Sequence, residues 1–595
     1  MDWPDPRQFG SLLDLHETAA GTHGPADAVA MVDDSGAITT WSATELLRRA
    51  DAAAWRLRAM GLESGQRLLT WGPSSPQLAA VFLGALRAGI VLVPLDLRMT
   101  PDVVERIAAG AEASAIVLGT GRDAPDPREV HLPNLVRRTV DELTAEPRTG
   151  LDGGAKPAAT AAATAEPTTT PDADVPTDWR APLATWPRPD RASPFAIMYT
   201  SGTTGRPKGA VLSHGNILAT LEAADTIIPH RRHRIVSVLP LSHLFGQVEL
   251  FYALLAGAPI LYVRSRTPRV IFEAIRAHGV TTMVVVPQVL DLFWGALERE
   301  VARQGRTAAF GRLRRLARRL PYPARRVLFR HVHRQLGGGL RLVISAAAYL
   351  PPALQIAWED LGVTVMQGYG ATECGFASAQ TEHHHPVGTV GRPMPPARLR
   401  LDPGTGEVQV AGPNVFGGYW RDPQATAAVL DAEGWYHTGD VAAWNADGDL
   451  ILSGRLRNLI VLPNGFNVYP EDIENALRAA GIREAVALET TPGRIEAVVL
   501  PPDSQGLAEA GQVPSGPSRS PAEATALRAR IDGLVKAANQ SLDAQQRIAA
   551  WRLWPDADFP RTHTLKIRRD LVRAWMAVEG PIQVLDGEDG PRGDA

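Results

Sequence analysis

Residues 199–209, which read YTSGTTGRPKG, determine how the rest of the chain is interpreted. Glycines let a backbone turn tightly and approach a ligand closely, and hydroxyls and backbone N–H groups donate to phosphate oxygens. Lysine adds a mobile positive charge. The run therefore predicts a phosphate cradle made of Thr200, Ser201, Gly202, Thr203, Thr204, Gly205 and Lys208.

An apolar run at residues 195–199 precedes this cradle and predicts a buried strand leading into it. The motif is not a Walker A loop, because Pro207 stands before Lys208 and Gly209 follows it. The alternative interpretation is an ordinary surface loop, since Gly, Ser and Thr are also common turn residues.

Length and composition limit the possible classes of protein. A chain of 595 residues exceeds one domain, and 45% hydrophobic with 21% charged residues is typical of a soluble globular protein. A net charge of −3 argues against nucleic acid as a partner. The single cysteine, Cys374, suits a reducing compartment, and residues 1–10 show no secretory signal, so we expect a cytoplasmic location.

Lysine is rare in this chain. Only four of its 61 basic residues are lysines, namely Lys156, Lys208, Lys536 and Lys566. A lysine at a motif position in such a chain suggests that the compact ammonium group is needed there, although chance placement is the alternative.

Residues 36–118 alternate between helical and strand patterns. A capping-box sequence begins at Ser42, Gly89 follows a helical pattern, and residues 90–95 read as a buried strand. Such alternation predicts an α/β protein whose large N-terminal domain, residues 1–454, has sheets flanked by helices.

The run at 199–209 closely resembles the phosphate-binding signature of the adenylate-forming superfamily, which includes acyl-CoA synthetases, peptide-synthetase adenylation domains and beetle luciferases. The resemblance extends from about residue 30 to residue 575. Further stretches in the family's order are VLPLSHLFGQVEL (238–250), MQGYGATEC (366–374), WYHTGD (435–440), SGRLRNLIV (453–461) and PRTHTLKIRR (560–569).

The stretch at 366–374 carries nucleotide-binding residues by this resemblance. It implies that Tyr369, beside Gly370, stacks on adenine, that Thr372 contacts phosphate and that Glu373 holds Mg²⁺. A single carboxylate beside a polyphosphate is a usual way to hold that ion. The alternative for Glu373 is a solvated side chain at a strand end.

The later stretches supply the ribose site, a hinge and a catalytic lysine by the same resemblance. Asp440 and Arg455 are implied to contact the ribose, and Arg457 occupies the hinge position. Gly465 is implied to let the pantetheine arm of CoA pass, and Lys566 is implied to be catalytic together with Lys208.

His243 matches a family position that gates the carboxylate pocket, and the resemblance implies a catalytic role for it. A lone histidine among apolar residues is otherwise more often a satisfied core residue. The sequence departs from the family at Ala346 and Ala347, where two glycines are frequent, at Val461, where some relatives have a lysine, and at Leu565, where glycine is usual.

Residues 302–336 contain eleven arginines and no acidic residue. Phe310, Leu313, Leu316 and Leu320 are interleaved and can form one apolar helix face. One interpretation is a solvated basic helical hairpin. The other is contact with an anionic membrane surface at the inner face of the membrane, favoured by a similar insertion in long-chain fatty acyl-CoA synthetases.

Two segments have compositions typical of disorder: residues 145–185 are rich in Ala, Thr and Pro, and residues 502–522 are rich in Gly, Pro and Ser. The resemblance implies a small mobile α+β C-terminal domain at 455–578, followed by a polar tail at 579–595 that we expect to be frayed.

The resemblance implies an ATP- and Mg²⁺-dependent ligase that converts a carboxylic acid, with a long-chain fatty acid favoured, to acyl-AMP and then to acyl-CoA with coenzyme A. Two alternatives remain at this point: an acyl-AMP ligase that loads a carrier protein, and a non-catalytic membrane-surface protein that uses the arginine-rich segment. Neither the oligomeric state nor the pathway follows from these patterns.

Overall fold

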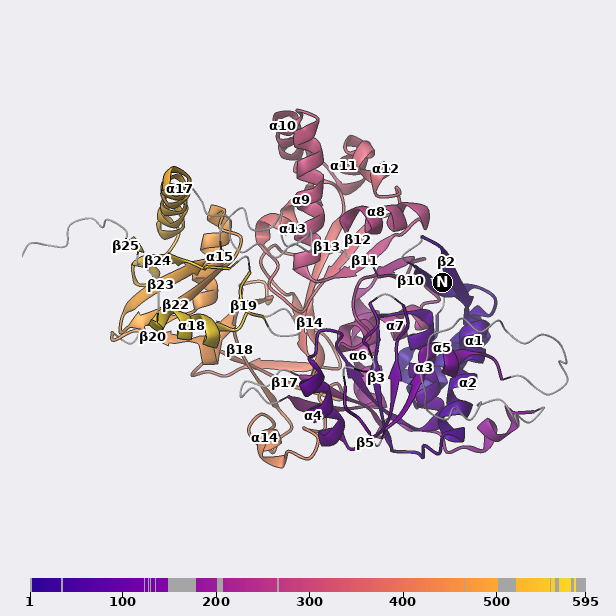
Figure 1. Cartoon of the computed structure of the whole chain (residues 1–595). Coiled ribbons are helices and arrows are strands. Elements are labelled where there is room, and N and C mark those ends of the chain that lie inside the picture. Colours follow the sequence, from indigo (N-terminus) through magenta and orange to yellow (C-terminus); the bar gives the residue numbers. More distant parts are fainter. Residues whose placement is uncertain are drawn as a thin grey trace, which may run out of the picture. The chain divides into compact units, whose positions relative to one another are not determined.

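The computed structural model describes residues 3–33, 36–121, 123–126, 128, 130–133, 135–147, 178–200, 207–264, 267–464, 466–500, 521–556, 558–561, 567–578 and 583–584. The chain forms two compact units, Met1–Leu399 with Val410–Tyr436, and Arg400–Gln409 with His437–Ala595 (Figure 1). Of the segments expected to be loose, 145–185 and 502–522, residues 148–177 and 502–520 lie outside the described residues.

The larger unit contains a six-stranded sheet in which β3, β4, β5, β6 and β7 run parallel and β8 is antiparallel to β7. This confirms the expected layered α/β arrangement. In spatial order the strands are β6 (Val136–Thr139), β5 (Ala113–Leu118), β3 (Arg67–Trp71), β4 (Val91–Leu95), β7 (Pro194–Thr200) and β8 (Lys208–Ser213).

The same unit contains a nine-stranded sheet with a parallel centre and antiparallel edges. Its spatial order is β15 (Arg392–Pro393), β14 (Gly375–Ala379), β13 (Thr364–Ala371), β12 (Leu342–Ser345), β11 (Thr282–Val285), β9 (Ile235–Ser237), β10 (Ile260–Val263), β1 (Asp27–Val32) and β2 (Ile38–Ser42).

Helices pack against these sheets, and the capping box expected at Ser42 forms only in part, because the Glu45 carboxylate binds Arg48 and Arg49 instead of returning to the N-cap backbone. The Ser42 hydroxyl accepts from the backbone N–H of Glu45 at the start of α2 (Ala43–Ala59), and Gly89 ends α3 (Pro76–Ala88) in the left-handed region. The other helices of this unit are α1 (Leu12–His23), α4 (Pro101–Ala111), α5 (Val140–Thr144), α6 (His214–Ile227), α7 (Leu244–Leu255), α8 (Pro268–Ala277), α9 (Pro287–Arg303), α10 (Thr307–Ala317), α11 (Tyr322–Leu328), α12 (Arg330–Gln335), α13 (Pro352–Asp360) and α14 (Pro423–Ala427).

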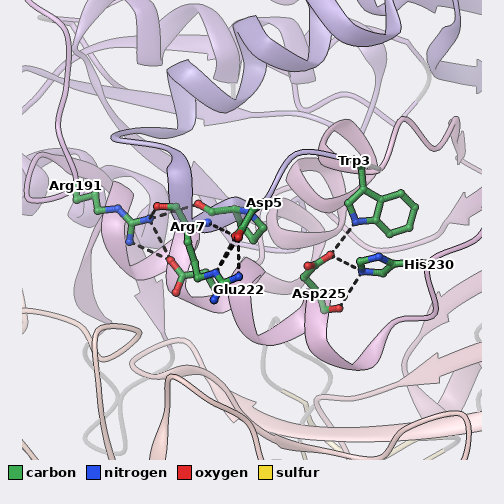
Figure 2. Close-up of polar contacts among 8 residues, drawn as sticks. Trp3, Asp5, Arg7, Arg191, Glu222, Asp225 and His230 are labelled. Carbon is green, nitrogen blue, oxygen red and sulfur yellow. Dashed lines mark hydrogen bonds and ion pairs between the residues drawn. The ribbon is translucent and has the colours of Figure 1, made fainter. Parts of the chain in front are cut away.

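The N-terminal segment is fastened to α6, the helix that follows β8 (Figure 2). The Trp3 indole donates to Asp225 at 2.9 Å, and the His230 ring lies 3.0 Å from the same carboxylate. Arg191 pairs with Glu222 at 3.1 Å and donates to the backbone carbonyl of Phe9. These contacts hold α6, which begins directly after β8.

The arginine-rich segment folds as helices α10, α11 and α12, but its apolar residues do not share one face. Phe310 packs against Trp294 and the buried Phe329, whereas Leu313 and Leu316 are 37% and 49% exposed. The inner position is taken instead by Arg314, which pairs with buried Asp360 at 3.0 Å. No helix among the described residues is long and apolar enough to cross a membrane.

The smaller unit is an α+β domain with its own core, including Ile473, Leu477 and Trp551. Its sheets are β16 (Arg398–Leu401), β17 (Glu407–Ala411), β18 (Tyr436–Trp444) and β19 (Leu450–Arg455); β20 (Ile460–Val461) with β21 (Asn467–Val468); and β22 (Ala485–Thr491), β23 (Arg494–Val499), β24 (Ala550–Leu553) and β25 (Gln583–Val584). Its helices are α15 (Pro470–Ala480), α17 (Pro521–Gln540) and α18 (Arg569–Val578).

Two places are more ordered than their composition indicated. Residues Ala181–Thr185, at the end of the insertion expected to be loose, form a 3₁₀ helix with Leu183 buried. Within the polar tail, β25 pairs with β24 through Val584 and Ala550. In both places tertiary contacts compensate for a weakly apolar local sequence.

Candidate nucleotide and carboxylate site

The predicted phosphate cradle spans the turn of the β7–β8 hairpin. Thr200 pairs with Lys208 across this hairpin, while residues 201–206, which include Ser201, Gly202, Thr203, Thr204 and Gly205, lie outside the described residues. A Cβ at Gly209 would lie 2.6 Å from the Ile197 side chain and 3.0 Å from the Tyr199 ring. The glycine after the lysine is therefore required for the two strands to approach this closely.

Lys208 and Glu373 both contact Tyr419. The Lys208 ammonium lies 5.3 Å from the centre of the Tyr419 ring, and the Tyr419 hydroxyl donates to Oε1 of Glu373 at 2.9 Å. Burial, with the neighbouring Glu373 charge, raises the pKa of Tyr419, so the phenol remains a donor. Among the described residues no carboxylate forms an ion pair with Lys208.

The residues predicted to contact adenine and phosphate lie on the β13–β14 hairpin. Tyr369 and Gly370 belong to β13, and Thr372 and Glu373 form the turn. The strand register shifts between Tyr369 and Gly370, and a Cβ on Gly370 would lie 1.9 Å from the Gly375 carbonyl oxygen. A bulge at this point re-aims the Tyr369 side chain, and only glycine fits after it.

Residues 412–420 brace this hairpin turn from outside. The backbone N–H of Phe416 donates to the Glu373 carbonyl at 2.8 Å, and the Asn414 amide donates to the carbonyl of Cys374 at 2.5 Å. Asn216, in the first turn of α6, donates in turn to the Pro413 and Val415 carbonyls. Helix α6, which follows β8, and the Glu373 turn are therefore connected through one loop.

The residues around Glu373 fit a magnesium ion held together with a polyphosphate. Glu373 is buried, Tyr419 engages only its Oε1 atom, and no described residue donates to its Oε2 atom. No cluster of three or more His, Cys, Asp or Glu side chains able to hold a metal occurs in the described part of the chain. A single carboxylate matches an ion whose other oxygen ligands come from phosphate and water.

His243 is bound to a buried carboxylate and is not a core histidine. It precedes α7, its side chain is 33% exposed, and its Nε2 lies 2.7 Å from Oδ2 of Asp96. Burial opposes ionisation of Asp96, but hydrogen bonds from His243 and Arg98 hold its pKa well below the usual value. The Asp96 carboxylate therefore fixes the orientation of the imidazole.

The two predicted ribose residues come together within the smaller unit. Asp440 and Arg455 are partners across β18 and β19, and the Arg455 Nε atom lies 2.8 Å from Oδ1 of Asp440. Arg457 follows in a short 3₁₀ helix, where burial and the neighbouring Arg455 lower its pKa.

Lys566 and Gly465 lie outside the described residues. Both ends of the segment that contains Lys566 are described: Arg561 and Ile567 form an antiparallel bridge. Arg569 then pairs with half-buried Glu474 on α15 at 2.6 Å and donates to the Ala487 carbonyl. Burial raises the pKa of Glu474 to about 7, opposed by the Arg569 charge.

Sequence reasoning missed two residues that hold predicted site residues. Tyr419 lies in the run GGYWRD, whose glycines indicated only a turn, and Asp96 lies 147 residues before His243. A polar side chain directly after the buried strand β4 was the available signal for Asp96. At Ala347, where the family frequently has glycine, the backbone φ of 69° falls in the left-handed region that favours glycine.

The larger unit thus holds Lys208 on the β7–β8 hairpin, Tyr369 on the bulged strand β13 and buried Glu373 in the adjoining turn, three positions at which the sequence resembles the adenylate-forming superfamily. The sequence matches the family of AMP-binding enzymes over residues 17–420. The chain belongs to this family, and the expected superfamily and fold are confirmed.

Relatives of this chain differ in the acids that their names specify. It is 27% identical over 571 residues to the long-chain-fatty-acid–CoA ligase FadD15 of Mycobacterium bovis, covering 91% of this chain and 92% of that protein. It is 29% identical over 491 residues to a feruloyl-CoA synthase of Amycolatopsis, covering 79% and 85%. The fold resembles o-succinylbenzoate CoA synthetase from Bacillus subtilis in complex with an acyl-adenylate, with a TM-score of 0.69, 18% identity, and 97% and 99% coverage.

Proposed function

We propose that this protein is an AMP-forming acyl-CoA ligase that activates a long-chain fatty acid with ATP and transfers the acyl group to coenzyme A. The observation that carries the proposal is the Lys208–Tyr419–Glu373 arrangement, which brings a cation and a carboxylate to one phenol. Similarity to FadD15 over nearly the whole chain favours the fatty acid, while similarity to a feruloyl-CoA synthase keeps aromatic acids as candidates.

In the first step a substrate carboxylate oxygen attacks the α-phosphorus of ATP, and the bond from that phosphorus to the bridging oxygen breaks to release pyrophosphate. Two anions must approach, so the site has to neutralise charge. One cation about 4 Å away at an effective dielectric of about 20 contributes roughly 4 kcal/mol. If that contribution arises only in the transition state, it amounts to about a thousandfold in rate.

Each residue has one proposed role in this step. Lys208 and the cradle at 200–205 bind the β- and γ-phosphates, Tyr369 with Gly370 faces the adenine, and Thr372 contacts phosphate. Glu373 holds Mg²⁺, which when bound offsets phosphate charge. Asp440 and Arg455 bind the ribose, and Lys566 bridges the carboxylate and the α-phosphate.

In the second step the CoA sulfur attacks the acyl carbon of acyl-AMP, the carbon–oxygen bond to AMP breaks, and the thiol proton leaves to solvent. We place a hinge at Arg457, where backbone rotation would withdraw Lys566, and a passage for pantetheine at Gly465. His243, oriented by Asp96, gates the carboxylate pocket.

We further propose that the protein is cytoplasmic and contacts the inner membrane face through α10. The exposed Leu313 and Leu316 beside Arg312, Arg315 and Arg319 support this proposal, because they combine apolar area with positive charge.

Pyrophosphate release across saturated fatty acids of increasing length, and across ferulate, tests the substrate class, with acyl-CoA formation from free CoA measured in parallel. We expect release with long chains and conversion to acyl-CoA. Release without acyl-CoA formation would instead indicate a carrier protein as acceptor, and no release with any acid would support a non-catalytic role.

A further inference from the structure

A series of buried and half-buried polar side chains leads to β13, the strand that carries Tyr369. Gln355 on α13 is fully buried, and its Nε2 donates to Oε1 of Glu359 at 3.1 Å and to the carbonyl of His385 at 3.2 Å. Its Oε1 accepts from Nε2 of Gln367 on β13 at 3.1 Å. Gln355 therefore uses both ends of its amide and connects helix, loop and strand.

The series reaches β13 at Gln367, two residues before Tyr369. Gln367 and Tyr369 share one face of β13, because side chains two residues apart on a strand point the same way. The backbone N–H of Gln367 donates to Oε1 of buried Gln380 at 2.9 Å, and the backbone N–H of Gln380 donates to the Gln367 carbonyl at 2.8 Å. The hairpin is thus fixed by side chains directly before its bulge.

At its other end the series contains an ion pair, between His385 and Glu359, that lies beside the arginine-rich segment. Nδ1 of His385 lies 3.1 Å from Oε1 of Glu359, and the hydrogen bond with Glu359 raises the pKa of His385. Tyr322 of α11 lies edge-on to the His385 ring, with centres 6.0 Å apart. Arg325 stacks on Tyr322 and donates to the Glu359 backbone carbonyl at 2.9 Å.

We infer that Gln355, Gln367, Glu359 and His385 form a positioning relay that sets the placement of Tyr369 against the nucleotide base. The inference rests on the proposed nucleotide role of Tyr369. A core that needed only stability would accept apolar side chains here, since replacing buried polar partners by well-packed apolar groups is often neutral. Four connected polar groups instead hold one geometry, because an alternative geometry leaves buried groups unpaired.

The relay assigns a positioning role to His385, the last of three consecutive histidines. Of these three, His385 contributes to the relay through its ion pair with Glu359. His383 is exposed on the same turn and provides a matched control.

Variants Gln355→Met and Gln367→Met test the relay, because methionine has similar length and lacks the amide. With wild-type activity measured as fatty-acid-dependent pyrophosphate exchange, we expect each variant to raise KM for ATP about tenfold, the effect of losing a buried hydrogen bond. KM for the acid and kcat should change less than about twofold. Glu359→Gln keeps an acceptor at Oε1 and should restore most of what Glu359→Leu loses, and His383→Gln should be silent.

Amide hydrogen exchange of the full-length, nucleotide-free protein is the second measurement and needs no activity. We expect faster exchange over residues 364–371 in Gln355→Met and Gln367→Met, and unchanged exchange there in His383→Gln. Unchanged exchange together with unchanged KM for ATP would overturn the relay. An inactive wild type would overturn the proposed function, and the exchange comparison would then still decide whether the relay holds β13.

Discussion

The hydroxyl of Tyr419 donates to Oε1 of Glu373 at 2.9 Å, while the ring of the same tyrosine lies 5.3 Å from the Lys208 ammonium. The two charged groups are thus set by one side chain, on a loop that Asn414 and Phe416 tie to the Glu373 turn. Tyr419 positions the proposed metal carboxylate, and the ring helps to orient the proposed phosphate lysine.

We expect Tyr419→Phe to raise the Mg²⁺ concentration for half-maximal activity about tenfold, because the variant keeps the ring near Lys208 and frees the Glu373 carboxylate from its donor. Pyrophosphate release titrated with Mg²⁺ at saturating ATP measures this. Tyr252→Phe is the control, since the buried Tyr252 hydroxyl has no hydrogen-bond partner in the described part of the chain. Equal Mg²⁺ requirements in both variants would contradict the role of Tyr419.

The buried carboxylate of Asp96 should matter for the acid substrate and for stability. Its folded-state pKa is lowered, so it stabilises the fold above the ordinary aspartate pKa near 4 and loses that contribution as pH falls below it. We expect Asp96→Asn to lower the free energy of unfolding at pH 7 by about 2 kcal/mol. KM for the fatty acid should rise while KM for ATP stays constant, because His243 loses its orienting partner.

Denaturant unfolding and steady-state kinetics check the Asp96 prediction. Asp126→Asn is its control, because Asp126 pairs with Arg128 in the same i, i+2 arrangement as Asp96 with Arg98, but on the surface. If Asp96→Asn instead raised KM for ATP and left KM for the acid unchanged, this would contradict the placement of His243 at the carboxylate pocket.

Glu249 predicts a pH dependence of stability. Its Oε2 accepts from Ser237 at 2.5 Å, its Oε1 has no partner among the described residues, and burial raises its pKa to about 8. Between about pH 4.5 and 8 the unfolded carboxyl ionises while the folded one keeps its proton, so stability falls as pH rises. The slope from this one group is at most about 1.4 kcal/mol per pH unit.

Glu249→Gln should therefore stabilise the protein relative to wild type at pH 8 and change it little at pH 5. Melting temperatures across this range measure the difference, and exposed Glu273→Gln should leave the wild-type slope intact. A pH-independent difference between Glu249→Gln and wild type would show that Glu249 is ionised in the folded protein.

The outer face of α10 predicts selective binding to anionic membranes. The double variant Leu313→Ser/Leu316→Ser should lower the affinity for phosphatidylglycerol vesicles, measured by co-sedimentation, by at least about tenfold. Each leucine that enters the lipid contributes about 1.5–3 kcal/mol to binding. High salt should also weaken binding. Val578→Ser, which changes an exposed apolar residue far along the chain, is the control. Equal sedimentation with phosphatidylcholine vesicles would contradict the charge-based account.

Local patterns predicted the elements of the site and not their partners. Ser42 and Gly89 are decided by short-range backbone requirements, so the helix ends that they form follow from the sequence, as does the strand predicted at 195–199. Asp96 and Tyr419 act on His243 and Glu373 across 147 and 46 residues, and no periodicity encodes such pairs. On α10, periodicity placed Leu313 and Leu316 with Phe310, but the buried Asp360 draws Arg314 inward and turns those leucines outward.

Carboxylate-dependent exchange of pyrophosphate into ATP, compared between wild type and Lys566→Ala, tests the central claim most directly. We predict exchange in the wild type only when a fatty acid is present, and a loss of about a thousandfold in Lys566→Ala. Lys536→Ala, which changes an exposed lysine on α17, should behave as wild type. Lys566→Ala should still convert supplied acyl-AMP and CoA to acyl-CoA. Absence of acid-dependent exchange in the wild type, or undiminished exchange in Lys566→Ala, would contradict the account.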